Sequence, residues 1–429
     1  MNSSESMSAI ARTVRRLPAL VFVSLVAIAL ARDAVAAQGY TIPDWSRDSI
    51  RSTVLGETRK ISIALPTGYD FKSMADVHYP VLIVLDETYP SMTLASKILD
   101  ARLLAPLGGW VVPQMLIVSV ELGRTYVRDM TPPPVLGQPS PRAGRGGAPA
   151  FAKFLEDELL PWLAQHYRTS TYTTVYGVST AGLFAAWVYG YSPSKINSVL
   201  AISPALYWSP EAYQQIVSGI RSRTQPGRMF IAAGETEGTI IPEKVRQFLG
   251  EIGPSPTAAT TVMSQWYTNV GHFHSGYIGF RDGLQSIFRP VTLGGLGGYA
   301  STSGVYLPEY ERRRAAYRTA APNFGLAPKL PFWDTMSEVM NLADAGYDGL
   351  NTTVLPVLCD ELRASYPESW GVPVCDGHAL RRKRDFDGAA SAFKTALEKA
   401  QRADDQAGMD IARDGATQLD EARRKPTRP

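Results

Sequence analysis

The sequence has few of the residues that indicate a metal centre, and almost no excess of charge of either sign. Two of its 429 residues are cysteine and five are histidine. Structural zinc sites require four ligands, and Cys359 and Cys375 have no paired histidines near them, so we expect no metal site. The 43 basic and 40 acidic residues leave a net charge of +3. A field that weak does not favour nucleic acid or an anionic membrane as a partner.

Long apolar runs are also scarce, and the one at residues 17–31 follows three arginines near the N-terminus. This run is shorter than the roughly 20 residues that span a bilayer. It precedes Ala34-Val35-Ala36, a small-x-small pattern typical of a signal-peptide cleavage site. We therefore predict a signal peptide over residues 1–36 and a periplasmic or secreted protein without stable membrane insertion. An uncleaved membrane anchor is the alternative.

The predicted export affects the expected oxidation state of the two cysteines. A periplasmic or secreted chain meets oxidising conditions, under which cysteines close in sequence form structural disulfides. Cys359 and Cys375 are therefore predicted to pair in a single disulfide that closes a short loop.

The length of the chain and its alternating patterns predict an α/β fold with an added helical region. The mature chain exceeds the roughly 250–300 residues over which one core keeps growing. Short β-rich runs alternate with helical patterns up to about residue 288, which is typical of a mostly parallel sheet with helices on both faces. Beyond it come a glycine-rich linker at 293–298 and a helix-forming region. The domains predicted are 37–292 and 293–429.

Within the α/β region, the pattern also predicts individual elements. Apolar residues recur at helical spacing from Phe151 to Leu163, with Pro161 a candidate kink. The proline- and glycine-rich stretch 130–149 predicts a long loop. The expected strands are residues 60–65, 80–85, 115–120, 173–176, 198–202, 229–233 and 264–269.

The motif that indicates chemistry is centred on Ser179. The β-branched run 173–175 precedes it and a small, apolar helical stretch follows it, so that strand, tight turn and helix come in sequence. The close backbone approach at such a turn requires small residues two positions before and after the serine, and Gly177 and Ala181 occupy these positions. This is the pattern of a nucleophile elbow.

A serine hydroxyl needs a base to take its proton and a carboxylate to orient that base. His272 and His274 follow the last expected strand. Proteins with a nucleophile elbow place their base in this position, and we favour His272. Glu235 and Glu237 follow the strand between serine and histidine. We favour Glu237 as the acid and keep Glu235 as the alternative, because Glu235 is still close to the strand axis; a solvated acidic turn would look the same.

Acyl transfer also needs donors for the developing oxyanion. The backbone N–H of Thr180, at the start of a helix, and that of Glu87, in the early loop 86–89, are the expected donors. Tyr207 and Trp208 follow the strand after the elbow and are candidates for the substrate pocket, although packing in the core is the more common fate of such residues.

Several segments together resemble the putative esterase family of α/β-hydrolases, which includes esterase D and the enterochelin esterases. Beside the Ser179 elbow, the resemblance rests on Tyr79–Asp86, Arg128–Pro132, Phe154–Pro161 and Ile202–Trp208. It implies an α/β-hydrolase fold and a carboxylic ester hydrolase with Ser179 as nucleophile and His272 as base. The chain departs from the family pattern at Glu87, Ala181 and His274. The region after residue 293 is similar to a tetratricopeptide-like extension that some such proteins carry, and its helices are a candidate surface for protein contact.

The residues and the resemblance together predict an exported serine esterase that acts on a small-molecule ester through an acyl-enzyme and needs no cofactor. An acyltransferase could use the same residues, if an alcohol rather than water reached the acyl-enzyme. A catalytically inactive binding protein with a hydrolase fold is the third alternative.

Overall fold

The protein is described by a computed structural model that covers residues 46–66, 69–70, 72–85, 112–134, 144–192, 195–292, 303–344 and 353–424. The predicted signal peptide, the predicted oxyanion donor Glu87 and the glycine-rich linker 293–298 lie outside these residues. The described residues all belong to one compact unit.

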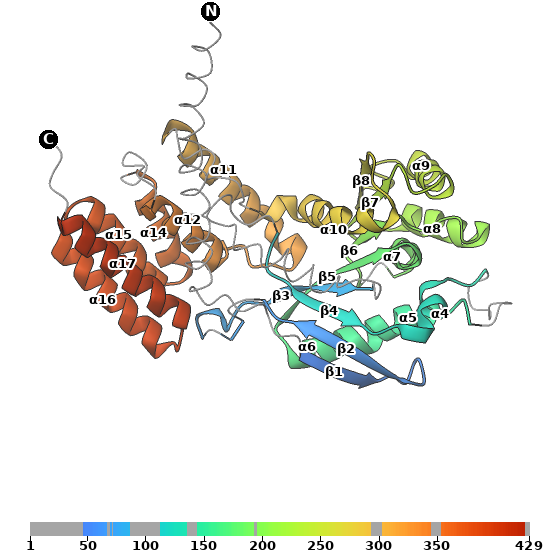
Figure 1. The fold of residues 1–429 in the computed structure, drawn as a ribbon, viewed down its shortest axis with the longest axis horizontal. Coiled ribbons are helices and arrows are strands. Elements are labelled where there is room, and N and C mark those ends of the chain that lie inside the picture. The colour runs from blue at the N-terminus through green and yellow to red at the C-terminus, as the bar shows by residue number, and fades with distance from the viewer. Residues whose placement is uncertain are drawn as a thin grey trace, which may run out of the picture. The chain divides into compact units, whose positions relative to one another are not determined.

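The centre of this unit is an eight-stranded sheet with the order β1-β2-β4-β3-β5-β6-β7-β8 (Figure 1). Strands β1 and β2, and β2 and β4, pair antiparallel, whereas every other neighbouring pair is parallel. This mostly parallel sheet with helices confirms the predicted α/β-hydrolase fold. The strands are β1 (Ser46–Arg51), β2 (Thr58–Ala64), β3 (Tyr79–Val84), β4 (Leu116–Val120), β5 (Thr169–Val178), β6 (Ser198–Ile202), β7 (Gly227–Gly234) and β8 (Thr260–Tyr267).

Alternating side chains of the central strands point to opposite faces of the sheet and build two cores. Val175 and Ile83 belong to one buried cluster, with helices α5 (Ala148–Phe154), α7 (Thr180–Tyr191), α8 (Pro210–Ser222) and α9 (Ile240–Ile252). Their neighbours Tyr176 and Leu82 belong to the other cluster, with α10 (His272–Phe288). The near-continuous apolar strands thus reflect burial on both faces.

The helix predicted ahead of the elbow strand forms with an irregular centre. Helix α5 continues through a π-helical turn, Leu155–Leu159, into α6 (Leu160–His166). Pro161 lies in the first turn of α6. Proline lacks an N–H and its ring clashes with the carbonyl four residues earlier, so a locally wider turn is a way to keep the helix continuous.

Three strand expectations differ from the structure. Strand β5 (Thr169–Val178) extends beyond the predicted range 173–176 at both ends. Strand β1 was not expected, because its sequence Ser-Arg-Asp-Ser-Ile-Arg is polar and only Ile50 is buried. It is an edge strand, and edge strands carry charged residues without an apolar pattern. Strand β8 begins at Thr260 and ends at Tyr267, earlier than the predicted range 264–269. Loop 130–149 contains no helix or strand in the parts described after α4 (Tyr126–Met130) and before α5.

The C-terminal region is helical. Tyr310, Phe324 and Leu358 of this region join the buried cluster on the α10 side of the sheet, whereas Phe393 and Leu419 belong to a separate small cluster. Within the described ranges, no helix is long and apolar enough to cross a membrane. The helices are α11 (Ser303–Ala320), α12 (Phe332–Asp344), α14 (Leu355–Ser365), α15 (Gly371–Arg382), α16 (Phe386–Arg402) and α17 (Gln406–Arg424), with a short 3-10 turn, η7 (Ala321–Phe324), after α11.

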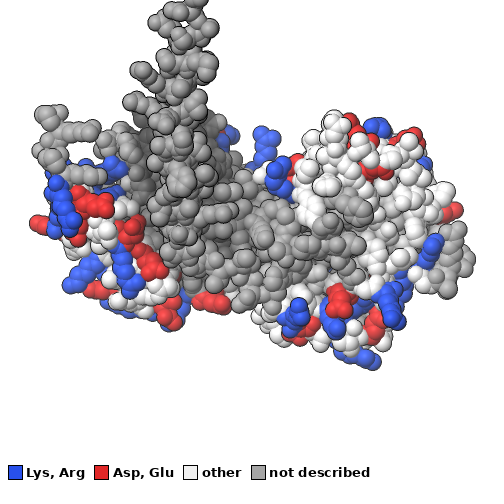
Figure 2. Space-filling view, viewed as in Figure 1, with Lys and Arg blue, Asp and Glu red and all other residues white. Residues whose placement is uncertain are grey.

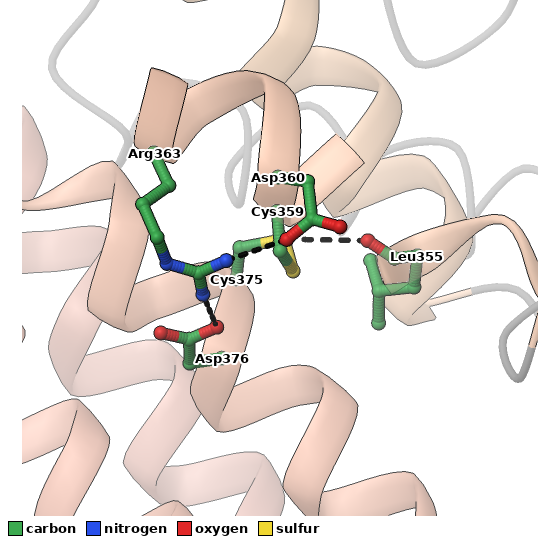
Figure 3. Close-up of a disulfide and its surroundings, with 6 residues drawn as sticks. All are labelled: Leu355, Cys359, Asp360, Arg363, Cys375 and Asp376. Atoms are coloured by element: carbon green, nitrogen blue, oxygen red, sulfur yellow. Dashed lines mark hydrogen bonds and ion pairs between the residues drawn. A yellow bond between two sulfur atoms is a disulfide. The ribbon is translucent and has the colours of Figure 1, made fainter. Parts of the chain in front are cut away.

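A disulfide joins two of these helices (Figure 3). Cys359 of α14 and Cys375 of α15 are bonded across 16 residues of sequence. Arg363 lies beside them and contacts Asp360 at 2.6 Å and Asp376 at 2.8 Å, so an ion-pair bridge runs parallel to the disulfide. Closing a loop of this length is worth about 3 kcal/mol in the loop-entropy account.

Basic and acidic side chains are interspersed on the face of the described residues shown in Figure 2. This agrees with the near-zero balance of charges in the sequence, because no large surface of one sign is visible on that face.

Candidate active site

Ser179 lies in a sharp turn between β5 and α7. Its backbone has φ 58° and ψ −116°, a conformation that L residues rarely adopt. The turn is held on both sides, because the Ser179 N–H donates to the Ile202 carbonyl (3.0 Å) and its carbonyl accepts from Ala205 N–H (3.0 Å). The half-buried Ser179 therefore has its strained backbone set by the neighbouring strand and loop.

The two small residues that flank the serine are not equivalent. A Cβ on Gly177 would overlap the backbone carbonyl of Ala181, so only glycine fits this position. Ala181 is fully buried with its methyl group in the core. Alanine in place of the usual glycine at this second position therefore fits the elbow without a clash.

Glu237 and His272 follow different strands and meet beyond the carboxyl ends of these strands. Glu237 lies after β7, and His272 is the first residue of α10, just after β8. His272 Nδ1 is 2.8 Å from Glu237 Oε2. The Glu237 side chain has no exposed surface, while 27% of the His272 side chain is exposed. The pair thus combines an enclosed carboxylate with an imidazole that remains open to solvent.

Burial alone would raise the pKa of the Glu237 carboxyl, but the hydrogen bonds it accepts outweigh burial and hold that pKa below its usual value. Oε1 accepts from the Ser203 hydroxyl (2.7 Å) and from Gly234 N–H (2.5 Å). A Cβ on Gly234 would overlap the Val270 carbonyl. The carboxylate is therefore ionised and locked in one orientation.

Ser203 links this carboxylate to the start of α10. Its hydroxyl is 2.7 Å from that of Ser275, and the Ser275 hydroxyl donates to the His272 carbonyl (2.7 Å). Ser203 and Ser275 are fully buried, and Ser203 has φ 46°. Ser203 thus donates to the acid and contacts the segment that bears His272.

Packing of α10 places His272 at the edge of the sheet where Ser179 lies. Gly276, one turn after His272, faces Val178, and a Cβ there would lie 3.2 Å from a Val178 methyl group. Val178 directly precedes Ser179. The residue before Ser179 and the first turn of the helix that begins at His272 are therefore packed against each other.

The structure separates the alternatives that the sequence left open. Glu235 is exposed and its backbone N–H donates to the Tyr267 carbonyl, whereas the carboxylate that is hydrogen-bonded to His272 is that of Glu237. His274 is exposed on α10. Among the other histidines, His166 bonds to the Trp162 carbonyl (2.7 Å), and His378 is buried in the C-terminal helices.

The start of α7 presents backbone donors beside Ser179. Thr180 is the first residue of this helix, so its N–H belongs to the unpaired first turn. The next N–H, of Ala181, donates to the hydroxyl of Tyr126 (3.1 Å). Tyr126 belongs to α4, which follows β4, a strand separated from β5 by β3. The Tyr126 hydroxyl therefore lies next to the predicted oxyanion donor Thr180, while the second expected donor, Glu87, is outside the described residues.

The aromatic pair expected at the substrate pocket follows the loop that carries Ser203. Tyr207 is 42% exposed and Trp208 is half-buried. The Arg145 guanidinium carbon lies 4.7 Å from the centre of the Trp208 indole ring. In the part of the chain that the structure describes, no group of three or more histidine, cysteine, aspartate or glutamate side chains is arranged to hold a metal ion.

Three residues of this region were not identified from the sequence: Ser203, Ser275 and Tyr126. Their roles depend on hydrogen bonds across 34, 72 and 55 residues of sequence, which no local pattern encodes. Only Ser203 lies in a segment that the family resemblance singled out, Ile202–Trp208.

The chain is similar to a known protein family and to a curated relative. Residues 52–256 match the family described as "Putative esterase". The ferri-bacillibactin esterase BesA of Bacillus subtilis (strain 168) is 29% identical over 177 residues, which span 37% of this chain and 60% of BesA. The chain thus covers less than two thirds of this relative.

Two solved structures share the fold. An IroE-like serine hydrolase from Shewanella oneidensis is 20% identical, with a TM-score of 0.57 over 69% of this chain and 93% of its own. An uncharacterised protein from Capnocytophaga ochracea DSM 7271 is 16% identical, with a TM-score of 0.54 over 88% of this chain and 100% of its own. The second match is longer than the sheet and its covering helices, so it includes part of the C-terminal helical region.

Proposed function

We propose that this chain, whose residues 52–256 match the putative esterase family, is an exported serine hydrolase of carboxylic esters. The observation that carries the proposal is the pairing of His272 with the ionised Glu237 at the sheet edge where the strained Ser179 turn lies. Such a pairing holds an imidazole in the tautomer that a base needs.

In the proposed reaction, His272 Nδ1–H bonds to Glu237, which leaves Nε2 to accept the Ser179 proton as Oγ attacks the ester carbonyl carbon. The N–H of Thr180 stabilises the oxyanion. The C–O bond to the alcohol then breaks, and the alcohol leaves with the proton from His272. Water, deprotonated by His272, attacks the acyl-enzyme and releases the acid with Ser179 regenerated.

Replacement of Ser179 by Ala should lower kcat for p-nitrophenyl acetate by at least about 10³-fold, because the nucleophile is lost. A fluorophosphonate should label wild-type protein at Ser179, located by peptide mass. Turnover of the ester by the Ser179→Ala protein at the wild-type rate would refute the proposed nucleophile.

The two glutamates after β7 offer a matched pair for the acid. Glu237→Gln should lower kcat by about 10³- to 10⁴-fold because it disturbs the tautomer of His272. Glu235→Gln should leave kcat nearly unchanged, since Glu235 is exposed. The reverse result would assign the acid to Glu235.

Two further parts of the proposal rest on the sequence and on relatives. Cleavage of residues 1–36 would leave a mature protein that begins at Ala37, which N-terminal sequencing of the exported protein tests. Because BesA is a ferri-bacillibactin esterase, a siderophore ester is the first natural substrate to assay.

A further inference from the structure

Arg145 occupies a turn whose backbone is held in place. Gly144 and Gly146 on either side of it have φ of 69° and 80°, a region that favours glycine. Gly146 N–H donates to the Thr131 hydroxyl (3.0 Å), and Gly147 N–H donates to the Arg128 carbonyl (2.8 Å). The sequence Gly144-Arg145-Gly146-Gly147 thus positions one long cationic side chain on an anchored loop.

The guanidinium of Arg145 lies over an indole ring whose residue is hydrogen-bonded, through one other residue, to the turn of the nucleophile. It lies 4.7 Å from the ring centre of Trp208. Trp208 N–H donates to the Ala205 carbonyl (3.0 Å), and Ala205 N–H donates to the Ser179 carbonyl (3.0 Å). Two backbone hydrogen bonds therefore connect the residue under the guanidinium to the Ser179 turn.

Arg145 differs from the nearby arginines in the partners of its guanidinium. Arg59 is paired with Asp129, and Arg128 is paired with Asp129 at 2.8 Å and with Glu57. Over the described ranges, no carboxylate forms an ion pair with Arg145, and its guanidinium lies against the Trp208 ring. An aromatic face holds a guanidinium without neutralising it, so its planar fork of donors keeps its positive charge for a ligand.

We propose that Arg145 and Trp208 form a subsite for a carboxylate carried by the ester substrate. The guanidinium binds the carboxylate through paired N–H donors, and the indole and the exposed Tyr207 contact the apolar part of the substrate. This subsite rests on the proposed esterase activity of Ser179. It adds a substrate class, esters with an anionic group remote from the scissile bond.

The test compares esters that differ only in that charge. Mono-p-nitrophenyl suberate carries a carboxylate on the acyl side, and its methyl ester is the neutral match. On the alcohol side, 5-butyryloxy-2-nitrobenzoate is compared with its methyl ester. All four release a nitrophenol that is followed by absorbance. Purified full-length mature protein should favour the anionic member of at least one pair by about 10-fold or more in kcat/KM.

Variants at position 145 assign the preference to the guanidinium. The ratio of kcat/KM between the anionic and neutral esters should fall towards 1 in Arg145→Met, and to an intermediate value in Arg145→Lys, which keeps the charge but loses the fork. The ratio within each variant is independent of the fraction of active protein. Lys153→Met, which removes an exposed positive charge from α5, is the matched control and should keep the wild-type ratio.

The outcomes separate the two proposals. Hydrolysis of neutral esters without preference for either anionic ester, or a preference that persists in Arg145→Met, overturns the carboxylate subsite and leaves the esterase proposal standing. Absence of turnover of all four esters, together with no fluorophosphonate label on Ser179, overturns the esterase proposal and the subsite with it.

Discussion

The buried carboxylate of Glu237 is ionised because of its hydrogen bonds. Burial opposes charge, and the bonds from Ser203, Gly234 and His272 reverse that effect. Since its folded pKa is depressed, Glu237 contributes stability above its unfolded pKa, and this contribution is lost as the pH falls through the folded value. One carboxyl group therefore serves both the fold and the proposed catalytic pair.

Ser203 is a positioning residue in this arrangement, since it contacts Glu237 and Ser275. Ser203→Ala should lower kcat/KM by about 10- to 100-fold, because a hydrogen bond to a charged group is worth about 1.5–3 kcal/mol. The loss of this bond also raises the pKa of Glu237. The acidic side of the pH profile of kcat/KM should then shift to higher pH.

Ser286→Ala is the control for Ser203→Ala. It removes a hydroxyl that bonds to the Asp282 carbonyl within α10 (2.7 Å), away from Glu237. Its pH profile should match that of the wild type. An unchanged profile in Ser203→Ala as well would show that Ser203 does not orient the acid.

His378 gives a pH dependence that belongs to the C-terminal helices. Burial, then the charges of Arg381 and Arg382, lower its pKa from 6.5 to about 3. Between these pH values the unfolded chain binds a proton that the folded chain does not, so stability falls with decreasing pH by at most about 1.4 kcal/mol per unit. Its ring nitrogens have no hydrogen-bond partner within the described structure, and it packs against Phe393.

His378→Leu should therefore unfold at higher urea concentration than the wild type at pH 5, with a smaller difference at pH 7.5. The leucine removes a titrating group and two unpaired nitrogens. Equal losses of stability in both proteins between pH 7.5 and pH 5 would assign the pH dependence to other groups.

At the scale of elements, the elbow is the part of the site that local sequence encodes best. Gly177 and Ser179 are two positions apart, and the contact that demands glycine is with Ala181, four residues away. Such short-range backbone sterics can be inferred without tertiary information. The π-helical turn before Pro161 and the polar edge strand β1 could not be, because each depends on neighbours that the local pattern does not reveal.

Gly177→Ala should destabilise the protein by more than about 1–3 kcal/mol, the usual cost of overpacking, because the new methyl group meets backbone atoms. Thermal unfolding and soluble yield measure this loss. Ala181→Gly, at the other flank, restores the usual residue of the motif and should retain ester turnover. A stable Gly177→Ala protein with wild-type turnover would contradict the steric account.

At the scale of the whole molecule, the sheet and the C-terminal helices share one buried cluster. Phe324 lies in η7, yet its ring centre is 5.1 Å from that of Tyr172 on β5 and 5.5 Å from that of Phe288 on α10. The proposed boundary at residue 293 therefore separates segments of sequence whose cores are in contact. Loss of the C-terminal contact should weaken the domain that carries Ser179.

Phe324→Ala should cost about 3–5 kcal/mol and lower the temperature at which ester turnover is lost, because it opens a cavity against β5 and α10. Asn323→Ala, at the exposed neighbouring position, should change stability by less than about 0.5 kcal/mol. If both proteins lose activity at the same temperature, the helical region does not support the hydrolase sheet.

The sequence by itself determined the alternation of strands β2 to β8 with helices, the mostly parallel sheet and the turn at Ser179, because apolar periodicity and backbone sterics act over a few residues. The tertiary structure decided which glutamate meets His272, and it brought Ser203, Tyr126 and Arg145 to the same edge of the sheet. Their partners lie tens of residues away, so their roles arise only when the parallel strands align their carboxyl ends.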